Sequence, residues 1–259
     1  MSTWTTETKT ELFSTCENCV VKDWCKLRNG QVKLPPEHML NYCVGYDKLE
    51  KALGLAKIPK EYRSANLNNY VEDADNADFA TILKDLLSNS VGFVTSGTNL
   101  ALINRGKGTG KSWTASAVLN EFIYKVCRDP QWFDYETPVG MYVKFGAWAN
   151  RQRDIYTRND EKFTYEAHRE LNLMNDVPLL IIDDIGSGRI TPIIRDLIYD
   201  VIDSRKEEQK STIFTSNFPG SILRQDDMLG DMVVSRMFYN TMVIPLGGRD
   251  RRGDSTHKY

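Results

Sequence analysis

A glycine-rich run that ends in lysine and serine is the most informative feature of the sequence. It spans residues 103–112 and reads Ile-Asn-Arg-Gly-Lys-Gly-Thr-Gly-Lys-Ser. A glycine-rich turn allows successive backbone N–H groups to point into one concavity, and a helix that begins there adds the positive end of its dipole. Lys111 is then expected to reach the β- and γ-phosphates of a nucleotide, and Ser112 to bind Mg²⁺ through its hydroxyl. The run therefore predicts a phosphate-binding loop.

The residues expected to cradle the phosphates are consecutive: Gly106, Lys107, Gly108, Thr109, Gly110, Lys111 and Ser112. One position departs from the usual pattern G-x-x-x-x-G-K-S/T, because Arg105 stands where that pattern has its first glycine. We expect Gly106 to supply the turn one residue later. The alternative is a chance glycine-rich loop, against which the apolar run before it and the helix-like segment after it both argue.

Two adjacent carboxylates follow an apolar run further along the chain. Residues 179–182 are Leu-Leu-Ile-Ile and predict a buried strand, and Asp183 and Asp184 come where that strand ends. Asp183 is expected to bind Mg²⁺, mainly through water, and Asp184 to polarise the water that attacks the γ-phosphate. The alternative is a strand ending in a solvated acidic turn. The phosphate loop upstream favours the catalytic interpretation.

Two further polar positions complete the candidate site. Asn217 follows the apolar run 212–215, where a polar side chain can orient the water near the γ-phosphate, although such a residue can also belong to an ordinary turn. Arg236 comes after a short helical segment. It could stabilise transition-state charge on a nucleotide held by a neighbouring subunit, or it could be a surface arginine. At this point both interpretations of Arg236 stay open.

Strand-like and helical segments alternate from about residue 81 onward. Strands are predicted at 100–103, 141–145, 179–182, 212–215 and 242–245, and helices at 112–126, 147–158, 191–206 and, more briefly, 220–229. The helix at 191 has a good N-cap, since threonine is followed by proline. Alternation of this kind predicts an α/β fold, with a parallel sheet flanked by helices and ligands at the carboxyl ends of the strands.

Composition narrows the class of protein. The chain has 259 residues, 41% of them apolar, and a formal net charge of −2. This balance gives no general attraction to nucleic acid, so any DNA contact must come from a local patch. We find neither a run of roughly 20 apolar residues that could span a membrane nor a signal peptide at the N-terminus. A cytoplasmic protein is therefore expected, in a compartment where clustered cysteines more often bind metal than form disulfides.

Four cysteines lie in the first 50 residues: Cys16, Cys19, Cys25 and Cys43. Four thiolates match the ligand count of a tetrahedral zinc site, and the opening C-x-x-C is usual for zinc. The five residues before Cys25 are atypical for zinc, and a similar run occurs in some proteins with a 4Fe–4S cluster. Free buried thiols are the third possibility. We expect a small zinc-binding domain whose folding depends on the metal.

A basic helix is the candidate DNA contact. Arg151, Arg153 and Arg158 share the predicted helix at 147–158 with Tyr156. Arginine charge combined with aromatic stacking is what single-strand binding uses. The alternative is an ordinary solvated helix face.

Taken together, these motifs resemble those of the AAA+ ATPases of the DnaC/DnaI helicase-loader group, which is close to the IstB transposition helpers. The resemblance covers roughly residues 55–245. It is carried by the segments 58–70, Gly108–Ser112, Leu180–Gly186, Asp203-Ser204-Arg205, Ile213–Asn217 and Ser235-Arg236-Met237. The combination of Asp-Asp-hydrophobic-Gly with Thr-Ser-Asn is fairly specific for this group, since many other AAA+ proteins have Asp-Glu.

The resemblance implies several further properties. Arg236 becomes the expected arginine finger, the sheet is expected in the order 5-1-4-3-2, and ATP-bound chains are expected to self-assemble and to contact single-stranded DNA. A sensor 2 arginine would come from Arg249, Arg251 or Arg252. The DnaI branch has a similar small zinc-bearing N-terminal domain that docks on the helicase. The expected division is a docking domain at 1–50, a linker and pre-ATPase segment at 51–80, and the AAA+ domain at 81–259.

These observations lead to one expected function and two alternatives. The expected function is an ATPase that loads a hexameric replicative helicase onto single-stranded DNA. One alternative is a transposition helper, and the other is an adaptor that binds ATP without useful turnover. An N-terminal metal domain favours the loader, and the pair formed by Asp184 and Asn217 argues against the adaptor.

Overall fold

The structure is a computed structural model that describes residues 44–66, 70, 72, 76–127, 136–158, 161–244, 246 and 250. Its centre is a parallel sheet in the order β2-β3-β4-β1-β5. The strands are β1 (Asn99–Ile103), β2 (Gly140–Lys144), β3 (Leu179–Asp183), β4 (Ser211–Ser216) and β5 (Thr241–Ile244). Counted from the other edge, this is the predicted order 5-1-4-3-2, which is confirmed.

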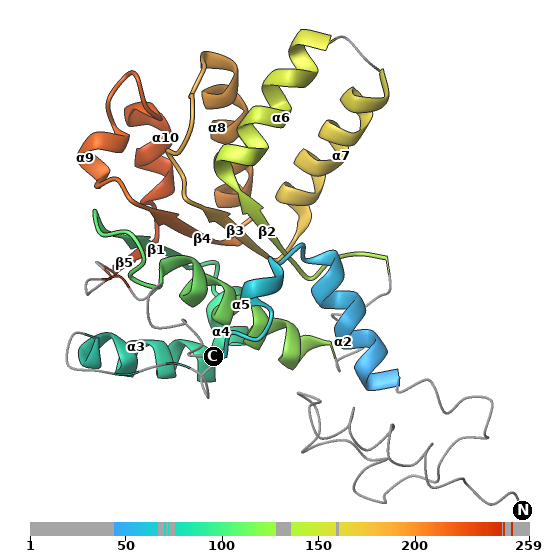
Figure 1. Ribbon diagram of the computed structural model, residues 1–259, viewed down its shortest axis with the longest axis vertical. Helices are drawn as coiled ribbons and strands as arrows, with labels where there is room; N and C mark the ends of the chain where they lie inside the picture. Colours follow the sequence, from blue (N-terminus) through green and yellow to red (C-terminus); the bar gives the residue numbers. More distant parts are fainter. Residues whose placement is uncertain are drawn as a thin grey trace, which may run out of the picture.

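Helices cover both faces of the sheet (Figure 1). On one face lie α2 (Val44–Leu55), the short 3-10 helix η3 (Lys60–Tyr62), α3 (Ala77–Ser88), α4 (Ser90–Thr95) and α5 (Lys111–Val126). On the other face lie α6 (Phe145–Arg158), α7 (Glu161–Asp176), α8 (Pro192–Glu207), α9 (Gly220–Leu223) and α10 (Gly230–Met237). None of the helices in the described part of the chain is long and apolar enough to span a membrane.

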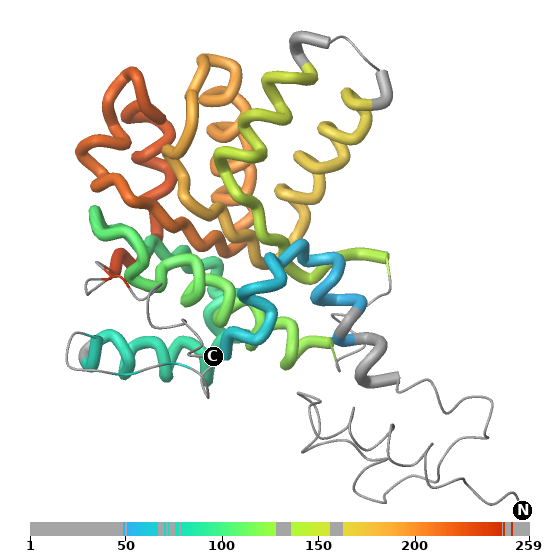
Figure 2. Tube along the Cα trace, in the orientation of Figure 1, coloured from blue at the N-terminus to red at the C-terminus, as the bar shows by residue number. Residues whose placement is uncertain are grey.

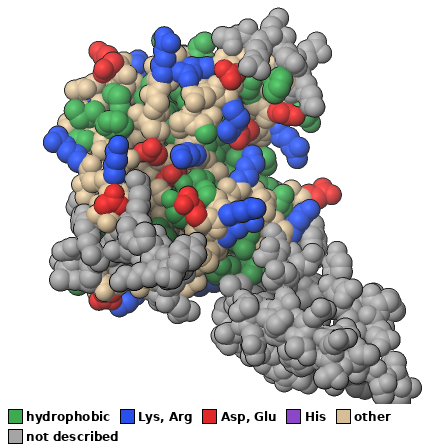
Figure 3. Space-filling model, viewed as in Figure 1, with side chains coloured by type: hydrophobic (Ala, Val, Ile, Leu, Met, Phe, Trp, Pro, Cys, Tyr) green, Lys and Arg blue, Asp and Glu red, His purple; other side chains and the backbone are tan. Residues whose placement is uncertain are grey.

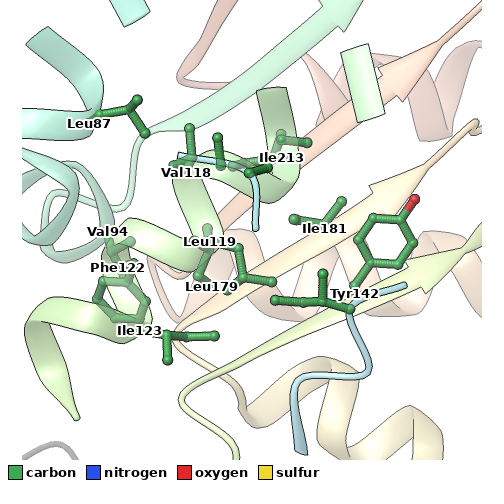
Figure 4. Packing of buried hydrophobic residues seen from close by; sticks show 14 of the residues in the cluster. Leu87, Val94, Val118, Leu119, Phe122, Ile123, Tyr142, Leu179, Ile181 and Ile213 are labelled. Carbon is green, nitrogen blue, oxygen red and sulfur yellow. The ribbon is translucent and has the colours of Figure 1, made fainter. Parts of the chain in front are cut away.

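The strands divide their side chains between two hydrophobic clusters. In β1, Leu100 and Leu102 belong to the cluster under α5, whereas Ala101 and Ile103 belong to the cluster under α6 and α8. Successive side chains of a strand point to opposite faces, and a parallel sheet covered on both faces has apolar residues at both. Figure 4 shows the first cluster, where Leu119 of α5 lies beside Leu179 of β3 and Phe122 lies beside Val94 of α4.

The predicted strands and most of the predicted helices are confirmed, with bounds that shift by one or two residues. Thr191 caps α8, because its hydroxyl accepts the N–H of Ile194 at 3.4 Å, and proline follows it as expected. The helix predicted near 220–229 is wrong in extent: α9 ends at Leu223, and α10 begins at Gly230, whose φ of +82° separates the two helices. Helix α7 was not predicted.

The segment at 51–80, expected to be a linker and pre-ATPase segment, contains more structure than a linker would. Helix α2 ends at Leu55 and α3 begins at Ala77. Leu53, Ile58 and Ala65 are buried in the same cluster as α5. This segment therefore packs as part of the core on that face of the sheet, where Figure 2 shows it passing from α2 toward β2.

A buried arginine fixes the two strands that carry the candidate site. Arg205 is 1% exposed, and its guanidinium donates to the carbonyl oxygens of Met174 and Val177 at 2.8 Å and of Ser211 at 2.5 Å, and to the Thr212 hydroxyl at 2.9 Å. Burial lowers the pKa of Arg205 to about 9, which leaves it charged at neutral pH. The side chain thus joins the end of α7 to the start of β4, on either side of β3.

Candidate active site

The glycine-rich loop curls around the lysine that follows it. The Lys111 ammonium donates to the carbonyl of Gly106 at 2.6 Å and lies 3.4 Å from the Asn104 carbonyl and from the Thr109 hydroxyl. Gly108 and Gly110 have φ values of +72° and +94°, in the left-handed region that favours glycine. The loop leads directly into α5, so the N-terminus of that helix and a buried ammonium face the same turn. This is the environment that anions occupy at helix N-termini.

The structure explains why arginine is accepted at the first loop position. Arg105 is exposed and its φ is not left-handed, so glycine is not required there. The left-handed residues of the loop are Gly108 and Gly110, whereas Gly106 is not left-handed. A Cβ at Gly106 would lie 2.9 Å from Thr109 Cγ2, so the close turn still favours glycine there. The N–H of Gly106 is instead held by the Asn104 side-chain oxygen at 3.2 Å.

Asp183 lies at the end of β3 and is bonded through both carboxylate oxygens. Oδ1 accepts a hydrogen bond from the Thr215 hydroxyl at 2.7 Å, and Oδ2 accepts one from the Tyr142 hydroxyl at 2.6 Å. Asp183 is only 4% exposed, and a buried carboxylate requires such partners. The Thr215 oxygen in turn accepts the N–H of Asp184 at 2.8 Å. One threonine of β4 therefore holds both acidic residues.

Asp184 and Asn217 meet across the ends of β3 and β4. The Asn217 amide donates to Asp184 Oδ1 at 2.7 Å. Asp184 has a φ of +56°, a left-handed conformation that aspartate and asparagine tolerate better than most residues and that recurs at functional sites. The fold thus brings together the two residues predicted to polarise and to orient the attacking water, although their roles stay predictions.

Sequence reasoning missed Tyr142 and Thr215. Burial and then the charge of Asp183 raise the pKa of the Tyr142 phenol, while the nearby Ser112 side chain opposes the rise. Tyr142 lies within an apolar strand, where its sequence suggests only a core residue. Thr215 belongs to the polar end of β4 that drew attention to Asn217, so its position was a usable signal.

The residues predicted to hold Mg²⁺ fit that ion. Ser112 and Asp183 come from different elements, α5 and β3, yet both lie beside the hydroxyl of Tyr142. Asp183 Oδ2 accepts a hydrogen bond from that hydroxyl at 2.6 Å, and the Ser112 side chain is near enough to lower the pKa of the phenol. A hydroxyl and a carboxylate are the hard oxygen donors that Mg²⁺ takes beside phosphates and water. The donor set beside the phosphate loop is thus suitable for a magnesium nucleotide.

The structure does not bring Arg236 to these residues. Its Nε donates to Asp203 Oδ1 at 2.8 Å, and its guanidinium lies 4.7 Å from the centre of the Tyr199 ring. Both partners belong to α8, and they hold the arginine on the face formed by α8 and α10. Its role as an arginine finger stays a prediction.

Two of the arginines proposed to bind DNA have partners within the chain. Arg151 forms an ion pair with Glu170 of α7 at 3.0 Å, and Arg153 donates to the Arg189 carbonyl at 3.3 Å. Arg151 and Glu170 also line a groove of about 600 Å³ between α6, α7 and the end of α2, which none of the nucleotide-site residues lines. On the face shown in Figure 3, acidic and basic side chains are interspersed.

Other predicted positions fall outside the described residues. These are the four N-terminal cysteines, Cys16, Cys19, Cys25 and Cys43, and the sensor 2 candidates Arg249, Arg251 and Arg252. Within the described ranges, no group of three or more histidine, cysteine, aspartate or glutamate side chains could hold a metal ion. The zinc site therefore stays a prediction.

The parallel sheet, the glycine-rich loop between β1 and α5, and the acidic end of β3 define a P-loop protein of the AAA+ class. Comparison with known families agrees with that class. The sequence profile described as IstB-like ATP binding protein matches residues 45–258, which is well over half of the chain. The chain belongs to this family of ATP-binding proteins.

Two curated relatives are helicase loaders. The replicative helicase loader DnaI of Bacillus subtilis (strain 168) is 25% identical over 156 residues, which cover 56% of this chain and only 45% of that protein. The replicative helicase loader DnaC of Buchnera aphidicola subsp. Baizongia pistaciae (strain Bp) is 26% identical over 193 residues, which cover 73% of this chain and 70% of that protein. The chain thus matches less than half the length of the first relative and more than two thirds of the second.

Solved structures share the fold. The crystal structure of the DnaC helicase loader superposes with a TM-score of 0.55 at 22% identity, covering 71% of this chain and 98% of that one. The crystal structure of DnaI gives a TM-score of 0.56 at 19% identity and covers 78% of this chain and 100% of that one. AMPPCP-bound DnaA from Aquifex aeolicus gives a TM-score of 0.52 at 18% identity and covers 75% of this chain and 53% of that one. At these identities the likeness concerns the fold alone.

Proposed function

We propose that the chain is an ATP-dependent loader that delivers a hexameric replicative helicase onto single-stranded DNA during DNA replication. The observation that carries the proposal is the contact of Asn217 with Asp184 beside the phosphate loop, because it assembles a hydrolytic set on a fold shared with helicase loaders. The curated similarity to two replicative helicase loaders supports the choice of partner.

The described residues supply distinct parts of ATP hydrolysis. The loop amides and Lys111 bind the phosphates, and Ser112 and Asp183 would hold Mg²⁺, which when bound neutralises developing charge on the phosphates. Asp184 polarises the attacking water, and Asn217 keeps the Asp184 carboxylate in place through its 2.7 Å hydrogen bond. The residues are fixed before substrate arrives, and such preorganisation is the usual source of electrostatic catalysis.

Arg236 is proposed to complete the site of a neighbouring subunit. It lies on the surface formed by α8 and α10, where the ion pair with Asp203 and the ring of Tyr199 restrict its side chain. An arginine held in this way can be presented to a nucleotide bound by the next chain. ATP-bound chains would then assemble so that each active site uses residues from two copies.

The segment at 1–50 is proposed to bind zinc through its four cysteines and to dock on the helicase. Metal analysis of the purified chain should find about one zinc per molecule and a colourless sample, by the four-thiolate stoichiometry of structural sites. A brown sample with bound iron would support an iron–sulfur cluster instead. A metal-free, folded chain with all four thiols free to titrate would contradict both.

Single-stranded DNA is the proposed second partner, through the helix α6. Because Arg151 is paired with Glu170, a phosphate would have to replace that carboxylate. DNA affinity should therefore fall steeply with salt, since it depends on counterion release. Replacing Arg151, Arg153 and Arg158 together should reduce the slope of log affinity against log salt. An unchanged slope would show that this face of α6 is solvated and does not bind DNA.

A loading assay tests the function directly. The chain is mixed with the hexameric helicase of its own source, ATP and closed circular single-stranded DNA, which offers no end for threading. We expect the chain to bind the helicase and to increase the amount of helicase on the circles, and the Lys111→Ala chain to fail in loading. Absence of helicase binding with and without ATP would refute the proposal.

A second candidate is a transposition helper, which the IstB-like family profile favours. A helper of this kind would coat duplex DNA in the presence of ATP and recruit a transposase. ATP-dependent coating of duplex DNA without any effect on helicase loading would select this alternative.

A further inference from the structure

We propose that Tyr142 is a positioning residue for the magnesium site, holding the Asp183 carboxylate in place beside Ser112 so that the metal–nucleotide complex binds. This inference rests on the proposed function. It adds a residue of β2, the edge strand, to a site otherwise built from the loop, β3 and β4.

The hydroxyl of Tyr142 lies beside both expected metal ligands. It donates to Asp183 Oδ2 at 2.6 Å, and the side chain of Ser112 is near enough to influence the pKa of the phenol. Hydrogen bonds to a charged group are shorter and stronger than neutral ones. Because the Thr215 hydroxyl occupies Asp183 Oδ1 at 2.7 Å, the carboxylate is fixed at both oxygens. Loss of the Tyr142 hydroxyl would leave Oδ2 without this donor and the carboxylate held through Oδ1 alone.

Tyr142 is itself held by the segment that follows α2. Its backbone N–H donates to the carbonyl of Ala56 at 2.8 Å, and its ring centre lies 6.5 Å from that of Tyr62. The ring packs in the cluster with Leu119 and Ile181, and Figure 4 shows the hydroxyl pointing away from Leu119 and Leu179. The residue is only 5% exposed. A phenol anchored in this way keeps its hydroxyl at one place.

A merely structural role would also explain a bonded buried carboxylate, so the test must separate the two. Tyr142→Phe removes only the hydroxyl. Tyr124→Phe is a matched control, because Tyr124 is similarly buried in the same cluster and its hydroxyl contacts the Arg63 carbonyl at 3.4 Å, with no contact to Asp183. Unfolding transitions of both variants establish that binding is measured on folded protein.

The measurement is binding of a fluorescent ATP analogue, first with a chelator and then during a titration with Mg²⁺. For Tyr142→Phe we expect unchanged affinity in the chelator and a half-saturating Mg²⁺ concentration raised about tenfold, the effect of losing one hydrogen bond to a charged group. Tyr124→Phe should behave as the natural chain. In an Asp183→Ala background, Tyr142→Phe should add no further effect.

Two results would overturn the inference. One is an unchanged Mg²⁺ dependence of Tyr142→Phe. The other is an equal loss of affinity with and without Mg²⁺, which would show a structural role. A natural chain that binds no nucleotide, or binds it without regard to Mg²⁺, would instead contradict the proposed function, so the two failures are distinguishable.

Discussion

Replacing Arg205 with methionine should strongly destabilise the fold, because the buried guanidinium joins the end of α7 to the start of β4. Methionine keeps the apolar stem of the side chain but leaves four buried acceptors without their donor, namely the carbonyls of Met174, Val177 and Ser211 and the hydroxyl of Thr212.

The expected loss follows from these contacts. A buried polar group left unsatisfied costs about 1–3 kcal/mol. Water can reach some of the freed acceptors, and the cost of burying the charge, visible in the lowered pKa of Arg205, is relieved. We therefore expect the free energy of unfolding to fall by about 3–5 kcal/mol, as in other cases where one partner of a buried charged network is removed. Against a typical total of about 5–15 kcal/mol, this is a large fraction.

Urea denaturation followed by circular dichroism measures the change. Arg169→Met is the matched control, since Arg169 is exposed on α7 and should change stability by less than about 0.5 kcal/mol. Arg205→Lys should be intermediate, because an ammonium keeps the charge but has only three donors. A loss below about 1 kcal/mol for Arg205→Met would refute the reasoning.

Three further predictions concern catalysis, assembly and pH. Asn217→Ala should slow ATP hydrolysis roughly 10²-fold with little change in ATP binding, because it removes the hydrogen bond that holds the Asp184 carboxylate. Unchanged turnover in a phosphate-release assay would exclude a role of Asn217 in hydrolysis. Arg236→Ala should reduce hydrolysis by about 10³-fold, the lower end for arginine fingers, and mixing it with Lys111→Ala chains should restore part of the activity; no recovery in mixtures that co-assemble would count against action in trans. Burial raises the pKa of Glu121 in the folded protein, and the charge of Lys125 partly opposes this rise. The folded protein therefore binds a proton at Glu121 more tightly than the unfolded chain does. The stability that this proton provides is present in acid and is lost as the pH rises above about 4.5. Glu121→Gln should therefore match the natural chain in acid and become the more stable of the two toward neutral pH, and urea midpoints that stay equal at both pH values would contradict this.

The sheet could be predicted because its sequence signals are local. Runs such as Leu179–Ile182 are apolar at every position, as strands buried on both faces must be, and each is followed by polar residues at its carboxyl end. The candidate site follows from the same logic. Parallel strands end at one edge of a sheet, so Asp184 and Asn217 had to lie near each other and near the loop.

Other features depend on tertiary contacts that no local pattern encodes. A buried arginine and an exposed one look alike in sequence, so the segment Asp203-Ser204-Arg205, although part of the family resemblance, did not show that Arg205 is an internal link. Tyr142 occupies an apolar strand position, and only the packing of β2 beside β3 brings its hydroxyl to Asp183. Helix α7 is a different case: it is largely polar, but Ala167, Leu171 and Met174 recur at helical spacing on its packed face, so its sequence held a usable signal that was missed.

The loop and the paired acids are proposed to form one ATP-hydrolysing site, in which ATP binding and ATP hydrolysis can be separated by mutation. Calorimetric ATP binding and steady-state hydrolysis, measured on the same preparations, test it. Lys111→Ala should lose binding, because it removes the charge that faces the phosphates. Asp184→Asn is the sharper variant, because asparagine also tolerates the left-handed φ of +56° and keeps the backbone in place.

We expect Asp184→Asn to bind ATP as the natural chain does and to hydrolyse it at least roughly 10²-fold more slowly. Normal turnover by this variant would contradict the assignment of Asp184. A natural chain that binds ATP yet shows no turnover, even with helicase and single-stranded DNA present, would contradict the claim of an ATPase.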